Sequence, residues 1–406
     1  MKIKLILIVS LLMAGVFIPG CGSTRNFDEH LNSIVKPYKF SILAWESRVI
    51  PGEIVQWAHG WLENIDNEAG TVTEYFSTVE QLKALEREIQ GVNSGARQGD
   101  PTLLETELTM LTERKLGLEK TVERIIEKQI KETLAEEEIF NPITSLKINF
   151  PPLNFKLERP PHLLVISPRD RIESTREIIL KQDISIEEME AIEDEADRLG
   201  VSSLVVELGG LGSTYPSFVT NEASLRFTID ATTEEWLHQY LFFKPLGMLY
   251  TLDLTGLSPN YEIATINETL ASMTSKEIGA IVYQKYYPQH GNSNNQGHTE
   301  ESGFDFNREM REIRITVDEY LAREEIELAE EFMEEKRQYL ASMGYHIRKL
   351  NQAYFAFHGA YADSPTSISP IGPELKKLRE QSSSIKAFLD KASLITSRQD
   401  LIESLQ

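Results

Sequence analysis

The segment Thr232-Thr-Glu-Glu-Trp-Leu-His-Gln-Tyr-Leu-Phe-Phe243 decides how the chain is interpreted. It predicts a helix over about 233–243. Residues four apart in a helix project from the same face, so Glu234 and His238 face one site, and Glu235 lies one step round from it. Carboxylate and imidazole groups at this spacing can ligate a metal ion, while a neighbouring carboxylate accepts a proton from water. The segment therefore predicts the first half of a metal site.

A second interpretation of the same residues needs no metal. Thr232-x-x-Glu235 has the pattern of a capping box, in which the Thr side chain accepts a hydrogen bond from the helix and the Glu reaches back. Glu234 and Glu235 would then lie in the first turn, where carboxylates interact favourably with the helix dipole. His238 would be a single, partly buried histidine. On this segment alone, both interpretations stay open.

A third ligand is expected on a later helix, because catalytic zinc sites use three protein ligands and leave one position for water. Glu268, within Asn267-Glu-Thr-Leu-Ala271, is the best candidate. The E-E-x-x-H and N-E-x-x-A segments together resemble the motifs of gluzincin metallopeptidases, and in particular those of bacterial predicted-aminopeptidase lipoproteins. Leu350-Asn-Gln-Ala-Tyr354 is similar to a late asparagine-containing segment of that group. The resemblance extends from about Val201 to Tyr361.

This resemblance implies a zinc-type metallopeptidase with His238 and Glu268 as metal ligands and Glu235 as general base. Glu234 occupies the position where the family has a histidine. Two Glu and one His make a harder and more anionic site, which accepts Mn or Fe more readily than a site with two histidines does. The expected cofactor is therefore zinc or another divalent transition metal, and the expected substrate is a peptide or protein.

Other side chains are weaker candidates for chemistry. His358 and Tyr361 could stabilise an oxyanion, although packing of an aromatic helix is the favoured interpretation. His290 and His298 flank an Asn-rich segment that we expect to be a solvated loop. Serine and cysteine nucleophiles find no support, because no G-x-S-x-G motif occurs and the sole cysteine is Cys21.

The N-terminus resembles a bacterial lipoprotein signal. A short basic start precedes the apolar run Leu5 to Phe17, as in a secretory signal peptide. Ile18-Pro-Gly-Cys21 resembles a lipobox, which implies lipid attachment at Cys21 and an exported chain anchored to the bacterial envelope. The alternative is an uncleaved anchor with an incidental cysteine. The net charge of −22 argues against nucleic acid and against electrostatic docking on anionic lipid.

The hydrophobic patterns predict an α+β fold that is mainly helical. A small mixed sheet would pack an edge strand on the active-site helix, and a helical hairpin would form an arm. Strands are expected at 146–150, 162–167 and 203–208. A glycine-rich turn at 209–219 would lead into the edge strand, where Pro216 needs no donor. The predicted organisation is a signal peptide at 1–20, a tether with helices at 21–71, the arm at 72–140, an α/β core at 141–304 and a helical region at 305–406.

These patterns favour a membrane-anchored, metal-dependent hydrolase, in particular a peptidase that uses metal-activated water. The alternative belongs to another class of protein. A catalytically inactive lipoprotein could keep the same fold as an envelope binding scaffold, with the arm contacting a partner. The arm may equally be a structural hairpin packed on the main domain, which is the favoured interpretation of that segment.

Overall fold

A computed structural model describes residues 25–49, 67–290 and 304–406. The predictions for the signal peptide, for Cys21 and for His298 lie outside these residues. The elements are α2 (Arg25–Val35), η1 (Lys36–Tyr38), α4 (Glu68–Asn93), α5 (Pro101–Glu136), β1 (Phe155–Leu157), β2 (His162–Pro168), β3 (Arg176–Leu180), α6 (Ile186–Asp197), β4 (Val201–Glu207), β5 (Gly210–Leu211), β6 (Ser217–Val219), α7 (Leu225–Leu241), α8 (Pro245–Leu254), α9 (Tyr261–Tyr286), η2 (Pro288–His290), α10 (Phe306–Ala322), α11 (Ile326–Ser342), α12 (Gln352–Gly359), α13 (Ile371–Glu380), α14 (Ile385–Ala392) and α15 (Arg398–Glu403).

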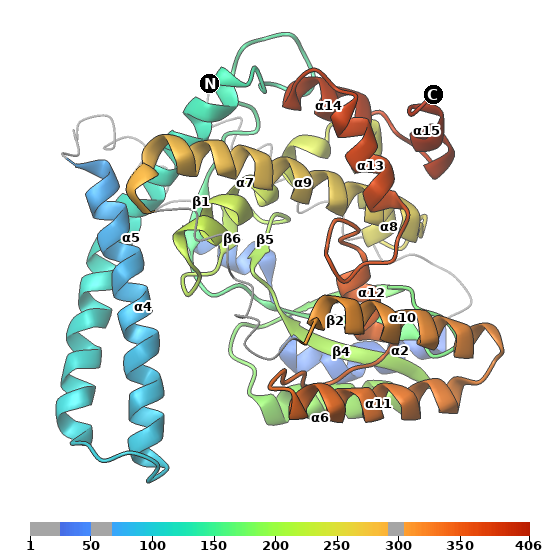
Figure 1. Cartoon of the computed structure of the whole chain (residues 1–406), viewed down its shortest axis with the longest axis horizontal. Helices are drawn as coiled ribbons and strands as arrows, with labels where there is room; N and C mark the ends of the chain where they lie inside the picture. Colours follow the sequence, from blue (N-terminus) through green and yellow to red (C-terminus); the bar gives the residue numbers. More distant parts are fainter. Residues whose placement is uncertain (1–24, 50–66, 291–303) are drawn as a thin grey trace.

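The predicted fold class is confirmed, because the chain is mainly helical with little sheet. One three-stranded sheet is mixed: β6 pairs parallel with β1 and antiparallel with β5. The other has the order β3-β2-β4 and is antiparallel throughout. Figure 1 shows the mixed sheet beside α7 and α9, and the antiparallel sheet in a lower lobe with α6, α10 and α11.

Helices α4 and α5 form the predicted hairpin, which projects from the body (Figure 1). Its inner end belongs to the main hydrophobic core, where Tyr75 and Ile126 are fully buried. Its outer part leaves large apolar side chains in water, with Leu103 67% and Met110 59% exposed. The arm is therefore anchored through its base, while its outer half is stabilised by the pairing of its two helices.

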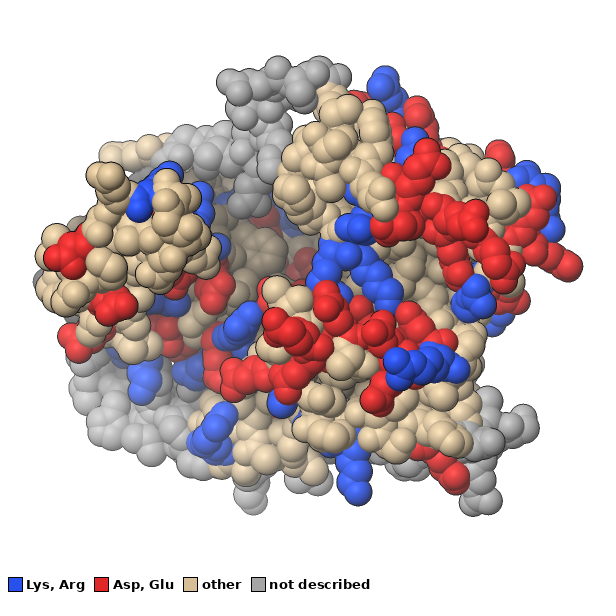
Figure 2. All heavy atoms as spheres, turned by 90° about the horizontal axis from the view of Figure 1, so that it is seen from below, with Lys and Arg blue, Asp and Glu red and all other residues tan. Residues whose placement is uncertain are grey.

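The surface carries the acidic excess of the chain, 63 Asp and Glu against 41 Lys and Arg. Seen from below, acidic side chains spread over much of the molecule, and basic side chains lie among them (Figure 2). No helix of the described residues is long and apolar enough to cross a membrane.

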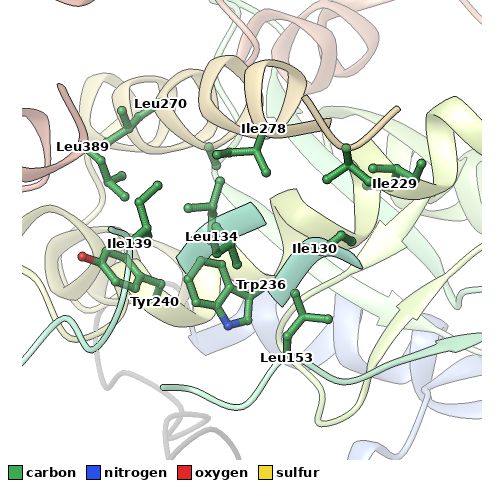
Figure 3. Close-up of a cluster of buried hydrophobic side chains, with 14 of the residues drawn as sticks. Ile130, Leu134, Ile139, Leu153, Ile229, Trp236, Tyr240, Leu270, Ile278 and Leu389 are labelled. Carbon is green, nitrogen blue, oxygen red and sulfur yellow. The ribbon is translucent and has the colours of Figure 1, made fainter. Parts of the chain in front are cut away.

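The main core surrounds α7 and α9 (Figure 3). Ile229 and Trp236 of α7 face the same apolar cluster as Leu270 and Ile278 of α9. The indole N–H of Trp236 donates to the backbone oxygen of Pro151, 2.8 Å away, so its one polar atom is satisfied. Tight packing on both helices holds their side chains in fixed rotamers. A site built across α7 and α9 therefore has rigid supports.

The start of the central helix differs from the prediction. Helix α7 begins at Leu225, where the Ser224 side chain accepts from the Phe227 amide at 3.3 Å. Thr232 lies in the middle of the helix, and its buried hydroxyl has no partner. The capping-box interpretation of Thr232 and Glu235 is therefore wrong. Helix capping does not explain the two acidic residues.

The strand predictions are partly wrong. Strands β2 and β4 lie where they were expected, but 146–150 forms no strand. Its alternating pattern finds no neighbouring strand to pair with, and Leu146 and Ile148 remain exposed. Pro216 immediately precedes β6, which is the central strand of its sheet, and β5 occupies the edge instead. The short strands β1 and β3 and the helix α8 were not predicted.

Candidate metal centre

Three predicted ligands come together where α7 faces α9. Glu234 and His238 are one turn apart on α7, and Glu268 extends from α9. One ligand atom from each lies within 4.8 Å of the other two, so the group could hold a metal ion. The i, i+4 pair and the later glutamate are thus brought together by helix packing rather than by a loop.

The hydrogen bonding of His238 leaves one nitrogen available to a ligand. Its Nδ1 atom lies 3.1 Å from Oδ1 of Asn267, and an amide oxygen can only accept. Nδ1 must therefore carry the proton, and the lone pair resides on Nε2. That atom lies 3.6 Å from Oε2 of Glu268. A second residue that fixes the tautomer in this way is typical of histidines that bind metals.

The carboxylate of Glu268 has one satisfied oxygen and one free oxygen. Its Oε1 accepts a hydrogen bond from the hydroxyl of Tyr250 in α8. Its Oε2 is buried and has no hydrogen-bond partner among the described residues. A buried carboxylate oxygen without a partner is costly. Because the free oxygen faces Nε2 of His238, the donor set fits a cation between them.

Glu235 lies against the glycine-rich segment that contains β5. The Gly212 amide donates to its carboxylate. A Cβ atom at Gly210 would lie 2.2 Å from Oε1 of Glu235, and one at Gly212 would lie 2.8 Å from its Oε2. Only glycine permits so close an approach. The glycine-rich run therefore lets β5 cross directly over the residue that was predicted to be the base.

The carboxyl groups of the site hold their protons strongly. Burial, followed by the nearby charge of Glu268, raises the pKa of Glu234 to about 8. Burial, together with the charges of Glu234 and Glu268, raises the pKa of Glu235 well above its usual value. Like charges crowded in a buried site oppose one another's ionisation. A divalent cation would relieve this repulsion, so the electrostatics and the geometry indicate the same occupant.

A cavity of about 240 Å³ opens onto the centre. The helices α7, α8 and α9 form one side of it, and the lower sheet and α12 form the other. Glu235, His238 and Glu268 line it, whereas Glu234 lies outside the lining. Its further lining includes Leu163, Ser174, Glu177, Ile179, Leu208, Gly210, Leu211, Tyr250, Asp253, Leu254, Tyr261, Phe357 and Tyr361.

The two candidate oxyanion stabilisers have different surroundings. Tyr361 lines the cavity, and burial together with the charges of Glu268 and Glu234 raises its pKa well above the usual value. His358 is absent from the lining and packs against Tyr354, with ring centroids 4.3 Å apart. Burial lowers the pKa of His358 to about 4. Tyr361 is therefore placed to contact a bound molecule, and His358 belongs to an aromatic cluster.

Comparisons of the chain with protein-family models, with curated proteins and with solved structures found no match. The arrangement at α7 and α9 is therefore interpreted from its own geometry and chemistry.

Three contributors to the site were not predicted. Tyr250 lies on the unpredicted helix α8, and no local pattern indicated its contact with Glu268. Asn267 was noted only as part of a motif, although its position beside Glu268 could have suggested a supporting role. The requirement for Gly210 and Gly212 was partly visible as an unusual density of glycine, but its cause is the close approach of Glu235.

Proposed function

We propose that this chain is a metal-dependent hydrolase that cleaves peptide bonds, with Glu234, His238 and Glu268 as metal ligands. The observation that carries the proposal is the convergence of their ligand atoms within 4.8 Å, beside a carboxyl group at the same end of a cavity. Zinc is the proposed ion, and manganese or iron is the alternative because two of the three ligands are carboxylates. When bound, such an ion polarises a carbonyl group and makes water more acidic.

Glu235 is the proposed general base. Its carboxylate lines the cavity next to the ligands and is oriented by the Gly212 amide. It takes a proton from water and delivers it to the departing amine, the usual exchange for a general acid–base residue. Its raised pKa suits this exchange, because a carboxyl that retains a proton near neutral pH can also return one.

Tyr361 and β5 are the proposed substrate contacts. The raised pKa of Tyr361 keeps its hydroxyl protonated, so it can donate to the oxyanion that develops from a carbonyl. Strand β5 lies at a sheet edge, and both of its residues line the cavity. An extended peptide could add to this edge through main-chain hydrogen bonds. The two contacts place a scissile carbonyl between the edge strand and the metal ligands.

The lipobox-like segment at Cys21 supports a location for this activity. We propose that the mature chain begins at Cys21 and is held on the envelope of a bacterial cell by its acyl groups. Mass spectrometry of the N-terminal peptide from a membrane fraction tests this. A lipid mass on Cys21 is expected, and an unmodified cysteine in the intact precursor would contradict it.

Metal content and hydrolysis together test the catalytic proposal. Protein from metal-replete growth should contain about one equivalent of a divalent transition metal, and Glu268→Gln should lose it. Glu235→Gln should keep the metal and lose hydrolysis of a mixed peptide library by a factor of at least about 10². Glu195→Gln, an exposed position on α6, is the matched control. Retained hydrolysis in Glu235→Gln would remove Glu235 from its role.

One observation favours a second candidate function, a non-catalytic envelope scaffold. Glu234 lies outside the cavity lining, and its pKa of about 8 leaves it mostly protonated at neutral pH. A protonated carboxyl is a poor metal ligand. Metal below about a tenth of an equivalent, with no hydrolysis from the wild type or from Glu234→His, would favour the scaffold.

A further inference from the structure

Glu177 is an acidic residue of the cavity wall that the proposed reaction does not use. It lies on β3, opposite Val165 of β2. Its side chain is open to the cavity, yet protein surrounds it so closely that burial is the main cause raising its pKa to about 7. Its recorded hydrogen bond comes from the Ser174 hydroxyl, at 2.9 Å. No basic side chain of the described residues forms an ion pair with it.

The charges around the cavity are unbalanced. Its lining includes four carboxyl groups, those of Glu177, Glu235, Asp253 and Glu268, and no lysine or arginine among the described residues. The outer surface is different, because basic side chains lie among the acidic ones there (Figure 2). A divalent ion at the metal centre would compensate two carboxylates at one end. Asp253 accepts from the Asn260 amide, so Glu177 is the carboxyl that most lacks a partner.

The surroundings of Glu177 suit a charged group on an aliphatic stem. Leu163 and Ile179 of the same sheet, Leu254 of α8 and Phe357 of α12 line the cavity with it. Apolar walls lower the local dielectric and strengthen the attraction between opposite charges. They also pack against the methylene groups of a lysine or arginine side chain. The cavity thus offers apolar contact and one unpaired negative charge.

We infer that Glu177 forms a subsite for a positively charged group of the substrate. The substrate class is a peptide with a protonated amine or guanidinium close to the scissile bond, either a Lys or Arg side chain or the N-terminal ammonium group. The term substrate rests on the proposed function. Binding of the cation depends only on the cavity and can be measured without hydrolysis.

Three ligands of similar shape test the subsite and identify the source of the charge. N-acetyl-lysinamide carries a side-chain charge, norleucinamide carries an α-ammonium group, and N-acetyl-norleucinamide is neutral. Calorimetry with the purified chain should show that at least one charged ligand binds about ten-fold or more tightly than the neutral ligand, as expected for a charge-assisted hydrogen bond. The preferred charged ligand shows which of the two cations the cavity selects.

Substitution then assigns the selectivity to Glu177. In Glu177→Gln the preference should fall to less than about two-fold, whereas Glu195→Gln, which removes an equal charge from the exposed surface, should keep it. Glu177→Thr is the second variant, because a β-branched residue suits the strand if glutamine disturbs it. Equal binding of all three ligands, no binding of either charged ligand, or selectivity that survives both substitutions would overturn the inference.

The result is distinguishable from failure of the proposed function. Charge-selective binding without peptide hydrolysis would remove the catalytic proposal and leave the subsite standing. Hydrolysis without any preference for cationic ligands would do the reverse. If both proposals hold, Glu177→Gln should lower kcat/KM for cationic peptides by about ten-fold or more and leave kcat/KM for neutral peptides nearly unchanged.

Discussion

The Nδ1 atom of His238 lies 3.1 Å from the side-chain oxygen of Asn267, the residue that immediately precedes the metal-ligand candidate Glu268. Two neighbours on α9 therefore act on one centre, one by orienting the imidazole and the other as a ligand. Because Asn267 is fully buried, the imidazole cannot exchange this partner for water without moving the helix.

Replacing Asn267 should weaken metal binding without removing a ligand. Asn267→Leu removes the acceptor at nearly constant volume, so the tautomer and orientation of His238 are no longer fixed. We expect metal affinity to fall by about 10–100-fold, as measured by competition with a chromogenic chelator. Asn267→Asp keeps an acceptor and should lose much less. Unchanged affinity in Asn267→Leu would contradict the orienting role.

The glycines beside Glu235 should be needed for activity and not for metal binding. Gly210→Ala places a Cβ atom about where Oε1 of Glu235 lies, so the carboxylate must turn away or β5 must shift. Hydrolysis should fall by at least about ten-fold while metal content stays near that of the wild type. The control is Gly117→Ala on α5, where nothing lies within 4 Å of the new atom. It should keep activity and stabilise the helix by about 0.5–1 kcal/mol.

Tyr361→Phe should reduce the chemical step more than substrate binding. Loss of one donor to a developing oxyanion lowers kcat by about 10²–10³-fold in comparable sites, while the aromatic ring still fills its place in the cavity. Steady-state kinetics separate the two effects. His358→Gln is a useful comparison, because His358 lies outside the cavity lining and its loss should spare kcat.

The metal-free chain should become less stable as the pH rises from 5 to 8. The folded-state pKa of Glu234 is about 8 and that of Glu177 is about 7, both raised mainly by burial, against a usual value of 4.5. A carboxyl with a raised pKa contributes stability that is complete below the unfolded pKa and is lost as the pH passes the folded pKa. Each group contributes a slope of up to about 1.4 kcal/mol per pH unit in that window.

Denaturant unfolding at each pH measures this slope. Glu234→Gln removes one titrating group and should flatten the dependence in metal-free protein. A saturating divalent ion should also counter the loss of stability, because ligands bind the ion in their deprotonated form. A stability that rises with pH between 5 and 8 in metal-free wild type would contradict the direction given by these pKa values.

Patterns in the sequence predicted the helical class, the hairpin arm and the three residues that converge at the centre. Those predictions rest on helical spacing, which persists whatever the surroundings. The start of α7 was misjudged because Thr232 fits a capping pattern, whereas Ser224 is the residue that caps the helix. The contact of Tyr250 with Glu268 and the opening of Glu177 into the cavity depend on tertiary packing between distant segments. No local periodicity encodes such contacts.

Placing the candidate ligands on α7 and α9 has a kinetic consequence. These two helices share the main core, so separating Glu234 from Glu268 would require opening the best-packed part of the protein, which is a rare event. An ion held there would exchange slowly, and its natural exit would be through the cavity. A peptide occupying that cavity would then close the exit, so metal loss to a chelator should slow while substrate is bound.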